Sequence, residues 1–462
     1  MKYISTRGQA PELTFEEAML TGLARDGGLY LPAEIPVMSH DEIAALAGLP
    51  YEDIAFRVMW PYVSGSFAED EFKQIIAHAY EGFGHDARAP LKQLNENHFL
   101  LELIHGPTLA FKDFAMQLIG QLFQVALKRR NDRVTIVGAT SGDTGSAAIE
   151  AFRGLDSVDV FILFPHGRVS EVQRRQMTTP ADSNVHALAV DGDFDDCQAA
   201  LKDMFNDFDF RDGVKLAGVN SINFARVLAQ IVYFFSAAVS LGAPHRKVSF
   251  TVPTGNFGDI FAGYLAKRMG LPIDRLVVAT NQNDILHRCL SGEGYFKGDT
   301  IPSISPSMDI QVSSNFERAL YYAYGEDGGA VAQLMDELKS GGFNVSQGAM
   351  EALRESFDSG RVSEGETLAT IRHTLAHSAE LVCPHTAVGI KVGQDHRATD
   401  TPMITLATAH PAKFPAAVEK ASDVHPPLPS RMSDLYERPE RVTRIANDLG
   451  AIEDHIKGHI AE

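Results

Sequence analysis

RVTIVGATSGDTGSAAIEAF, residues 133–152, begins with a short apolar run, continues into a glycine-rich turn and ends in a segment with helical spacing. The run is rich in β-branched residues, which is typical of a buried strand. The turn contains Gly138, Gly142 and Gly145. The stretch therefore predicts a β-strand, a tight loop and an α-helix, in that order.

The same pattern recurs along the chain. KVSFTVPTGNFGDIFAGYLAKRMG (247–270) repeats the whole unit, and DRLVVATNQNDIL (274–286) and MITLATAHPAKF (403–414) repeat the strand and its polar loop. Strands that alternate with helices predict an α/β fold with mostly parallel sheets, in which ligands bind at the carboxyl ends of the strands. Residues 1 to about 90 instead predict mainly helix, because TFEEAMLTGLA and EDEFKQIIAHAY carry apolar residues at helical spacing.

Composition excludes several classes of protein. The chain has 462 residues, 45% of them hydrophobic, and a formal net charge of −19, which argues against nucleic acid or an anionic membrane as the main partner. The longest apolar stretch, residues 231–243, is too short to span a bilayer, and MKYISTRG lacks the apolar part of a signal peptide. Three scattered cysteines, Cys197, Cys289 and Cys383, favour a reducing compartment. We therefore expect a cytoplasmic protein with no membrane partner.

We expect no metal site. His373 and His377 are four residues apart in a segment that predicts a helix, so they would share one face of it. No H-E-x-x-H pattern and no evident third ligand accompany them.

Two glycine-rich loops are candidates for anion binding. GATSGDTGS lacks the G-K-[ST] end of a P-loop and is not G-x-G-x-x-G, and PTGNFGD contains Gly255 and Gly258. Glycines let a backbone approach a ligand closely, and the amides at the start of the next helix can hold an anion. Taken singly, each loop is equally explained as an ordinary tight turn, and Asp143 could serve as a helix cap.

Lys112 stands out because HGPTLAFKDFAMQLIG (105–120) surrounds it with apolar residues. An apolar setting lowers the pKa of a lysine, and the neutral amine is a nucleophile that can form a Schiff base. Taken alone, the stretch equally allows a lysine whose stem lies on the core while its ammonium reaches water. Together with two anion loops, the lysine favours pyridoxal 5'-phosphate (PLP) as a cofactor, which supplies an electron sink.

These motifs resemble those of the threonine synthases, PLP enzymes of fold type II. The resemblance covers residues 3 to about 415 and includes YISTRGQAPELTFEEAMLTGLARDGGLYLP, HGPTLAFKDFAMQ, GATSGDTGSAA, PTGNFGD, SMDIQVSSNFERAL, PHTAVG and LATAHPAKFP. It implies an α/β fold with mostly parallel sheets in a large and a small domain, behind an N-terminal helical domain. We expect these to be residues 1–92 (N-terminal), 93–130 with 241–462 (large, PLP-binding) and 131–240 (small).

The resemblance also implies roles for individual residues. Lys112 would form the Schiff base with PLP and then move protons. The cofactor phosphate would lie against the loop of Gly255, Asn256, Phe257 and Gly258, and Thr408 would face the pyridine nitrogen. The substrate α-carboxylate would be held by the loop of Ser141, Gly142, Asp143, Thr144 and Gly145.

The implied reaction converts O-phospho-L-homoserine and water to L-threonine and phosphate, by γ-elimination and β-addition of water. The substrate phosphate needs fixed donors, and we expect Asn223 and Arg226, which are three residues apart and would share a helix face, together with Lys413. Exposed surface charges are the alternative for Arg226 and Lys413. Asn281 and Asn283 could line the cofactor face or belong to a plain turn.

Two other functions fit the same residues. A PLP-dependent phospho-lyase or dehydratase would release 2-oxobutyrate, because the fate of the intermediate depends on where water is placed. A non-catalytic binding protein would have no need for the Lys112 amine. Cys383 precedes PHTAVG where the family pattern has an acidic residue, and a buried structural cysteine is the simpler interpretation.

Overall fold

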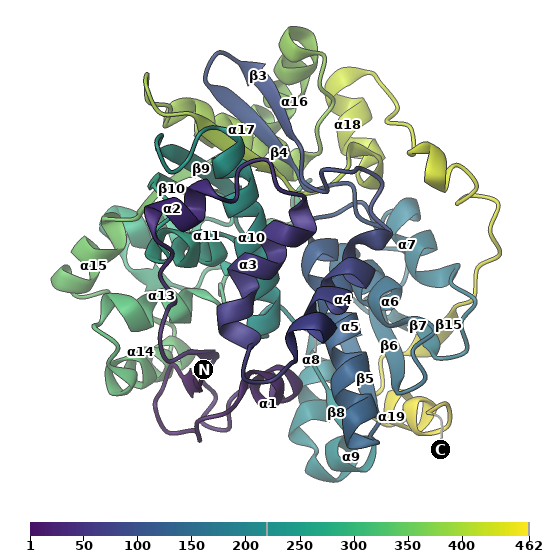
Figure 1. Cartoon of the computed structure of the whole chain (residues 1–462). Coiled ribbons are helices and arrows are strands. Elements are labelled where there is room, and N and C mark those ends of the chain that lie inside the picture. The colour runs from purple at the N-terminus through teal and green to yellow at the C-terminus, as the bar shows by residue number, and fades with distance from the viewer. Residues whose placement is uncertain (219, 461–462) are drawn as a thin grey trace.

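The computed structural model describes residues 1–218 and 220–460 and contains two parallel sheets with helices packed around them (Figure 1). The N-terminal region is mainly helical, as predicted, but it also holds a two-stranded antiparallel sheet that the sequence did not reveal. Its elements are β1 (Tyr3–Ser5), α1 (Phe15–Thr21), β2 (Tyr30–Pro32), α2 (His40–Ala44), α3 (Tyr51–Val63) and α4 (Glu69–Glu81).

The larger sheet has six strands in the order β13-β10-β9-β14-β4-β3, all parallel except for the antiparallel pair β3 and β4. Its strands are β3 (Leu91–Asn95), β4 (His98–Glu102), β9 (Val248–Pro253), β10 (Ile273–Thr280), β13 (Phe357–Arg361) and β14 (Met403–Ala407). β14 lies in the middle, where it joins β9 to β4.

The helices of this part of the molecule pack on the six-stranded sheet or on one another, and a two-stranded sheet (β11 with β12) lies beside them. They are α5 (Lys112–Arg130), α10 (Phe224–Ser240), α11 (Gly258–Arg268), α12 (Ile285–Arg288), α13 (Phe316–Ala323), α14 (Gly328–Lys339), α15 (Gln347–Arg354), α16 (Glu364–Ser378), α17 (Pro384–Asp395) and α18 (Pro415–Ser422), with β11 (Tyr295–Phe296) and β12 (Gly342–Phe343).

The smaller sheet has five parallel strands in the order β15-β7-β6-β5-β8. Four come from the middle of the chain, and the fifth, β15, comes from near its C-terminal end. The elements are β5 (Val134–Ala139), α6 (Asp143–Phe152), β6 (Val158–Pro165), α7 (Glu171–Thr178), β7 (Val185–Asp191), α8 (Phe194–Asn206), α9 (Phe208–Gly213), β8 (Leu216–Ala217), β15 (Thr443–Ala446) and α19 (Leu449–Lys457).

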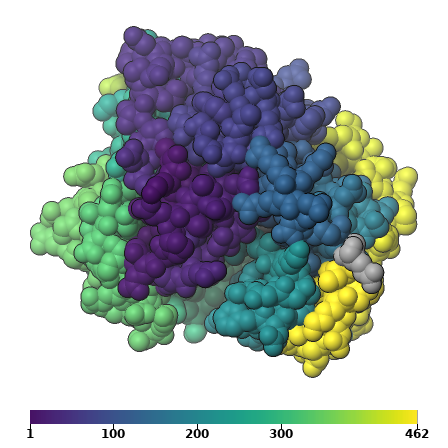
Figure 2. Space-filling model, turned by 60° about the horizontal axis from the view of Figure 1, so that its bottom comes forward, coloured from purple at the N-terminus to yellow at the C-terminus, as the bar shows by residue number. Residues whose placement is uncertain are grey.

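The C-terminal segment therefore lies with the small sheet. Residues beyond about 440 (yellow) lie beside α8 and α9 (teal) in Figure 2, and α19 packs on α8. The sequence assigned this segment to the large domain, so its place beside β7 is a difference from that expectation. A strand added at a sheet edge carries no local signal of its partner. The three domain boundaries otherwise stay a prediction.

The strand–loop–helix units predicted from the sequence are present. Residues 133–152 form β5, a loop and α6, and residues 247–270 form β9, a loop and α11. Strands β9, β10 and β14 are neighbours in the large sheet, and β5 belongs to the small one. In the described part of the chain, every helix is too short or too polar to cross a membrane.

Candidate active site

Lys112 is the first residue of α5, and its side chain is buried. Only 8% of the residue is exposed, its Nζ lies 4.8 Å from the centre of the Phe111 ring, and the same atom lies 3.8 Å from Asp143 Oδ2. Most of the lysine side chain is therefore packed in the interior, with its amine facing Asp143.

Burial lowers the pKa of Lys112 to about 8. Asp143 opposes this shift, whereas the positive charges of Arg226 and Lys413 add to it. About a tenth of the amine is consequently neutral at pH 7, which is far more than for an ordinary lysine and is the form that a nucleophile or a base requires.

The loop between β5 and α6 is shaped by glycines and by Thr140. Gly142 has a φ of 133°, which disfavours any other residue, and a Cβ at Gly145 would lie 2.4 Å from Thr140 Cγ2. The backbone N–H groups of Gly142 and Gly145 both donate to Thr140 Oγ1, at 2.9 Å. Those two amides are thus already paired, so an anion at this loop depends on its other groups.

Asp143 connects this loop to two lysines. Its Oδ1 lies 2.9 Å from Lys413 Nζ and accepts a hydrogen bond of 2.9 Å from Gln173 Nε2, while Oδ2 faces Lys112. Burial alone would raise the pKa of Asp143, but Lys413 and Lys112 hold it well below its usual range. Asp143 is therefore a carboxylate that keeps two buried ammonium groups together.

Lys413 is completely buried, which excludes the exposed-charge alternative. Besides its ion pair with Asp143, its ammonium donates to the backbone oxygen of Thr108 at 2.7 Å. Thr108 precedes Lys112 in the loop before α5, and Gln176 of α7 donates to the same oxygen at 3.0 Å. The cation expected to meet a substrate phosphate thus already has two partners on the Lys112 side of the site.

The second glycine loop lies between β9 and α11. A Cβ at Gly255 would lie 2.5 Å from the backbone oxygen of Ser307, and Phe257 has a φ of 63°. Ser313 Oγ donates to the Gly255 oxygen at 2.5 Å, and Asn315 donates to the Asn256 oxygen through its backbone N–H and its Nδ2, both at 3.1 Å. The loop is held from behind by residues 313–315, which leaves the start of α11 to face a ligand.

Asn223 and Arg226 lie at the start of α10, with Asn223 just outside the helix. Asn223 is the N-cap of α10, so its backbone is not yet helical; its Oδ1 accepts from Ala225 N at 3.1 Å and its Nδ2 donates to Met19 O at 2.8 Å. Asparagine is among the preferred N-caps, which explains its position. Arg226 is buried, and burial lowers its pKa to about 10, so the exposed-charge alternative is wrong for it too.

Thr408 follows β14 directly, and its backbone bonds to Phe111, which precedes Lys112, and to Thr386, which contacts Cys383. Its backbone oxygen accepts from Phe111 N at 2.9 Å, and its N–H donates to Thr386 Oγ1 at 3.3 Å. Cys383 is the buried N-cap of α17, with Sγ accepting from Thr386 N at 3.4 Å. Cys383 is therefore buried, as expected, and Thr386 lies between it and the Thr408 backbone.

Asn281 and Asn283 belong to a buried polar turn. Both amides donate to Asp309 Oδ1, at 2.8 and 2.9 Å, and Asn281 also donates to Ser303 and Ser305. These long-range hydrogen bonds attach the turn to residues 303–309, and whether it also lines the cofactor face stays a prediction.

Sequence reasoning assigned no role to two buried polar residues of this region, Asp259 and His385. Asp259 accepts from the Tyr233 hydroxyl through Oδ1, and burial raises its pKa to about 7, with Lys112 acting in the opposite direction. His385 accepts from Ser307 N at 3.2 Å, and burial lowers its pKa to about 4, so its ring is neutral. Asp259 directly follows GNFG and His385 lies in PHTAVG, so the quoted motifs contained the only signal.

The residues present fit PLP. A buried, largely deprotonatable amine stands at one helix start, and a glycine loop that has no room for side chains precedes another. One oxygen of Asp259, Oδ2, is buried without a hydrogen-bond partner in the described structure, as expected beside a site that receives a further polar group. In the described residues no cluster of metal-binding side chains occurs.

A family model described as "Pyridoxal-phosphate dependent enzyme" matches residues 85–402, which include both glycine loops and Lys112. The chain is a PLP-dependent enzyme of fold type II, with parallel α/β sheets. Models described as "Threonine synthase N terminus" and "Threonine synthase, C-terminal" match residues 2–80 and 386–456. The chain belongs to the threonine synthase family.

Known relatives agree over the full length. A threonine synthase of Pseudomonas aeruginosa is 56% identical, with 99% of this chain and 98% of the relative covered. The crystal structure of PLP-bound threonine synthase from Brucella melitensis is 55% identical, with a TM-score of 0.97 and 99% of each chain covered. Threonine synthase from Escherichia coli is 30% identical, with a TM-score of 0.84 and 100% of both chains covered.

Proposed function

We propose that this enzyme converts O-phospho-L-homoserine and water to L-threonine and phosphate, and that it does so in the cytoplasm. The observation that carries the proposal is the buried Lys112 amine, with its pKa lowered to about 8, held between the SGDTG loop and the GNFG loop. The names of the relatives support the same reaction.

In this proposal Lys112 binds PLP covalently, and the cofactor phosphate lies against Gly255, Asn256, Phe257 and Gly258. Backbone amides at the start of α11 and the helix dipole favour a dianion there. Thr408 faces the pyridine nitrogen with a neutral hydroxyl, which leaves that nitrogen largely unprotonated.

PLP supplies an electron sink for carbanions next to the substrate nitrogen. Lys112, when released by the incoming substrate amine, takes the α-proton and then a β-proton, and later returns one. Its depressed pKa suits all of these transfers, because a base works best when its pKa lies near the working pH. The carboxylate of Asp143 stays beside the amine and favours its protonated form after each abstraction.

The substrate phosphate, with a charge of roughly −1.5 to −2 by analogy with phosphoamino acids, requires cations in this acidic protein. Arg226 is the best-suited group, because it is buried and its charge acts on Lys112. Lys413 is the second cation, and through its ion pair it also orients the carboxylate of Asp143. The loop of Ser141 to Gly145 holds the α-carboxylate through groups other than the paired Gly142 and Gly145 amides and the Asp143 carboxylate, and Asn223 contributes by fixing the start of α10.

Product analysis tests the reaction. Purified enzyme incubated with O-phospho-L-homoserine should release threonine and phosphate in equal amounts. Release of 2-oxobutyrate with phosphate would instead assign it to the phospho-lyases, and absence of turnover would indicate a binding protein.

The role of Lys112 is tested by replacing it. Lys112→Ala should lose the visible absorption band of the lysine-bound cofactor and at least about a thousandfold in kcat, the order expected when a nucleophile that also acts as the base is removed. A Lys112→Ala protein that keeps the band would remove Lys112 from this role.

The role of Arg226 is tested separately. Arg226→Ala should mainly raise KM for the phosphorylated substrate.

A further inference from the structure

Arg318 is a buried cation that the reaction does not explain. It lies in α13, is 0% exposed, and is among the largest side chains completely hidden from solvent. Burial lowers its pKa to about 9, with Glu317 acting in the opposite direction. A charge held in such a place normally has a function or a partner that offsets its desolvation.

The guanidinium joins three separate parts of the chain. Its Nε and Nη2 donate to the backbone oxygen of Tyr30, at 3.1 and 2.6 Å, and Nη2 also donates to the oxygen of Ile222 at 2.6 Å. Its Nη1 donates to Asn315 Oδ1. One planar group thus fixes β2 of the N-terminal region, the segment before α10 and the segment before α13.

Asn315 carries this connection to the GNFG loop. With its Oδ1 held by Arg318, the amide turns its Nδ2 toward the Asn256 oxygen at 3.1 Å and the Ser221 oxygen at 3.0 Å. Asn315 is itself 0% exposed, so this orientation has no competition from water. A Cβ at Gly258 would lie 3.1 Å from the same Nδ2, which places the amide directly behind the loop.

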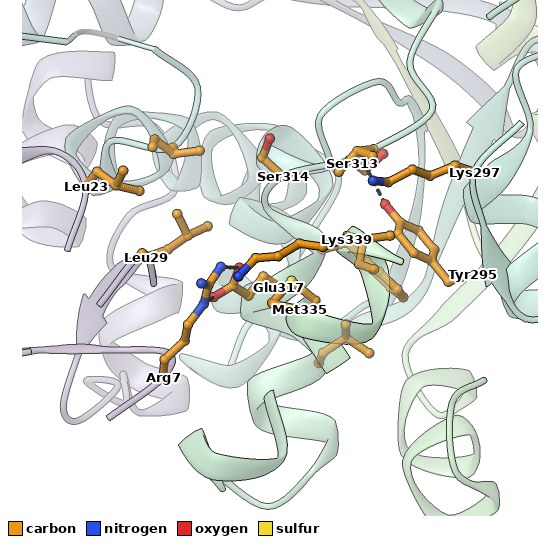
Figure 3. A pocket seen from close by; sticks show the side chains of 16 residues that line it. Arg7, Leu23, Leu29, Tyr295, Lys297, Ser313, Ser314, Glu317, Met335 and Lys339 are labelled. Atoms are coloured by element: carbon orange, nitrogen blue, oxygen red, sulfur yellow. Dashed lines mark hydrogen bonds and ion pairs between the residues drawn. The ribbon is translucent and has the colours of Figure 1, made fainter. Parts of the chain in front are cut away.

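The neighbouring residue Glu317 forms its ion pair with Arg7 and not with Arg318. Its carboxylate accepts from Thr6 Oγ1 at 2.6 Å and from Arg7 Nε and Nη2, both at 3.0 Å. Figure 3 shows Arg7 and Glu317 meeting at the edge of a cavity of about 310 Å³, on the outer side of the 313–317 segment. Within the described ranges, every hydrogen bond of Arg318 goes to an uncharged oxygen, and the charge of nearby Glu317 favours the charged guanidinium without pairing with it.

We propose that Arg318 is a positioning residue for the cofactor phosphate, which it serves by fixing Asn315 and thereby the GNFG loop. This inference rests on the proposed function. The planar guanidinium of Arg318 fixes the relative positions of three segments, because it donates to acceptors on all of them at once. Its buried charge lies behind a loop that receives a dianion, which gives the phosphate a favourable field that water screens poorly. The N-terminal region is then part of the cofactor site, although none of its side chains needs to touch PLP.

The test measures how tightly the holoenzyme retains PLP, by equilibrium dialysis with absorbance detection. Arg318→Met should weaken PLP affinity by about tenfold or more, the size expected for loss of hydrogen bonds that involve a charged group. Arg318→Lys should restore only part of it, because one ammonium cannot reach Tyr30, Ile222 and Asn315 together. Arg354→Met is the matched control, since Arg354 also binds a backbone oxygen, that of Leu290, away from the loop.

Asn315→Leu provides a second variant in case Arg318→Met does not fold, as judged by circular dichroism. It leaves Arg318 bound to Tyr30 and Ile222 but removes the Nδ2 donor that serves Asn256 and Ser221, while the backbone N–H of residue 315 still donates to Asn256. It should weaken PLP retention in the same direction. Folded variants that retain PLP like the wild type would overturn the inference, as would full rescue by Arg318→Lys, which would indicate charge alone. A wild-type protein that binds no PLP would instead overturn the proposed function.

Discussion

At the scale of single residues, the Lys112 amine and the Asp143 carboxylate control each other. The apolar neighbours of Lys112 were visible in the sequence and correctly indicated a lowered pKa. The pairing of Asp143 with Lys413 was not visible, because those residues are brought together only by contact between the two sheets' loops. Sequence therefore identified the members of the cluster but not their partners.

A pH prediction follows from the Lys112 pKa of about 8. The rate at which the apoenzyme captures PLP should rise with pH and level off above an inflection near 8, because only the neutral amine attacks the cofactor aldehyde. Asp143→Asn should move the inflection to lower pH, since Asp143 raises the pKa of Lys112. Stopped-flow absorbance at several pH values measures both.

Asp182→Asn is the control for that measurement, because Asp182 pairs with Arg153 at the C-terminal end of α6 and is not among the charges that shift the pKa of Lys112. Its inflection should match the wild type. An Asp143→Asn inflection at higher pH would contradict the assignment of Asp143 as the group that favours the ammonium.

At the scale of elements, the distance between Lys112 and Asp143 depends on how α5 packs against α6. These two residues begin the two helices, and further along, α5 approaches the backbone of α6 at Gly120. A Cβ at Gly120 would lie 2.2 Å from the backbone oxygen of Ala151. Only glycine permits this approach, so Gly120 sets the spacing of the two helices.

Gly120→Ala should therefore push the helices apart. We expect a loss of about 1–3 kcal/mol in stability, the usual cost of overpacking, together with a lower kcat as Lys112 and Asp143 separate. Gly365→Ala in α16 is the matched control, because no atom lies within 4 Å of a Cβ there. Urea unfolding and steady-state kinetics of both variants provide the comparison, and a Gly120→Ala protein as stable as Gly365→Ala would contradict the packing argument.

Elements were the scale at which the sequence was most informative. The β5–α6 and β9–α11 units follow from local patterns, since β-branched runs, glycine turns and helical spacing all agree. Strand β15 escaped notice because TRIA is short, exposed and specified only by its partner β7. The capping position of Asn223 was not predicted for a similar reason, because a cap and a first-turn residue look alike when only their spacing is known.

At the scale of the whole molecule, the C-terminal segment supports the sheet that carries Asp143. Ile452 of α19 is 0% exposed and packs in the core of the small sheet, in a cluster that includes Val137 of β5, the strand that leads to the SGDTG loop. Ile452→Ala should cost about 2–5 kcal/mol, as large-to-small changes in a core do. Hydrogen exchange followed by mass spectrometry should show faster exchange in β5, β6 and β7 than in the large sheet.

Val442→Ala is the comparison for Ile452→Ala, since Val442 lies just before β15 but is 48% exposed. It should leave exchange in the small sheet unchanged. Equal effects in both sheets for Ile452→Ala would mean that the two sheets unfold as one unit.

The central place of β14 in the large sheet has a consequence for how the protein folds during its synthesis. Strands β9, β10 and β13 on one side, and β3 and β4 on the other, are bridged only by residues 403–407 in the described sheet. During translation, these two groups of strands cannot pair into one sheet until residues 403–407 have left the ribosome. Lys112 and the GNFG loop lie on opposite sides of the gap, so the nascent enzyme has no complete cofactor site until nearly nine-tenths of it has been translated.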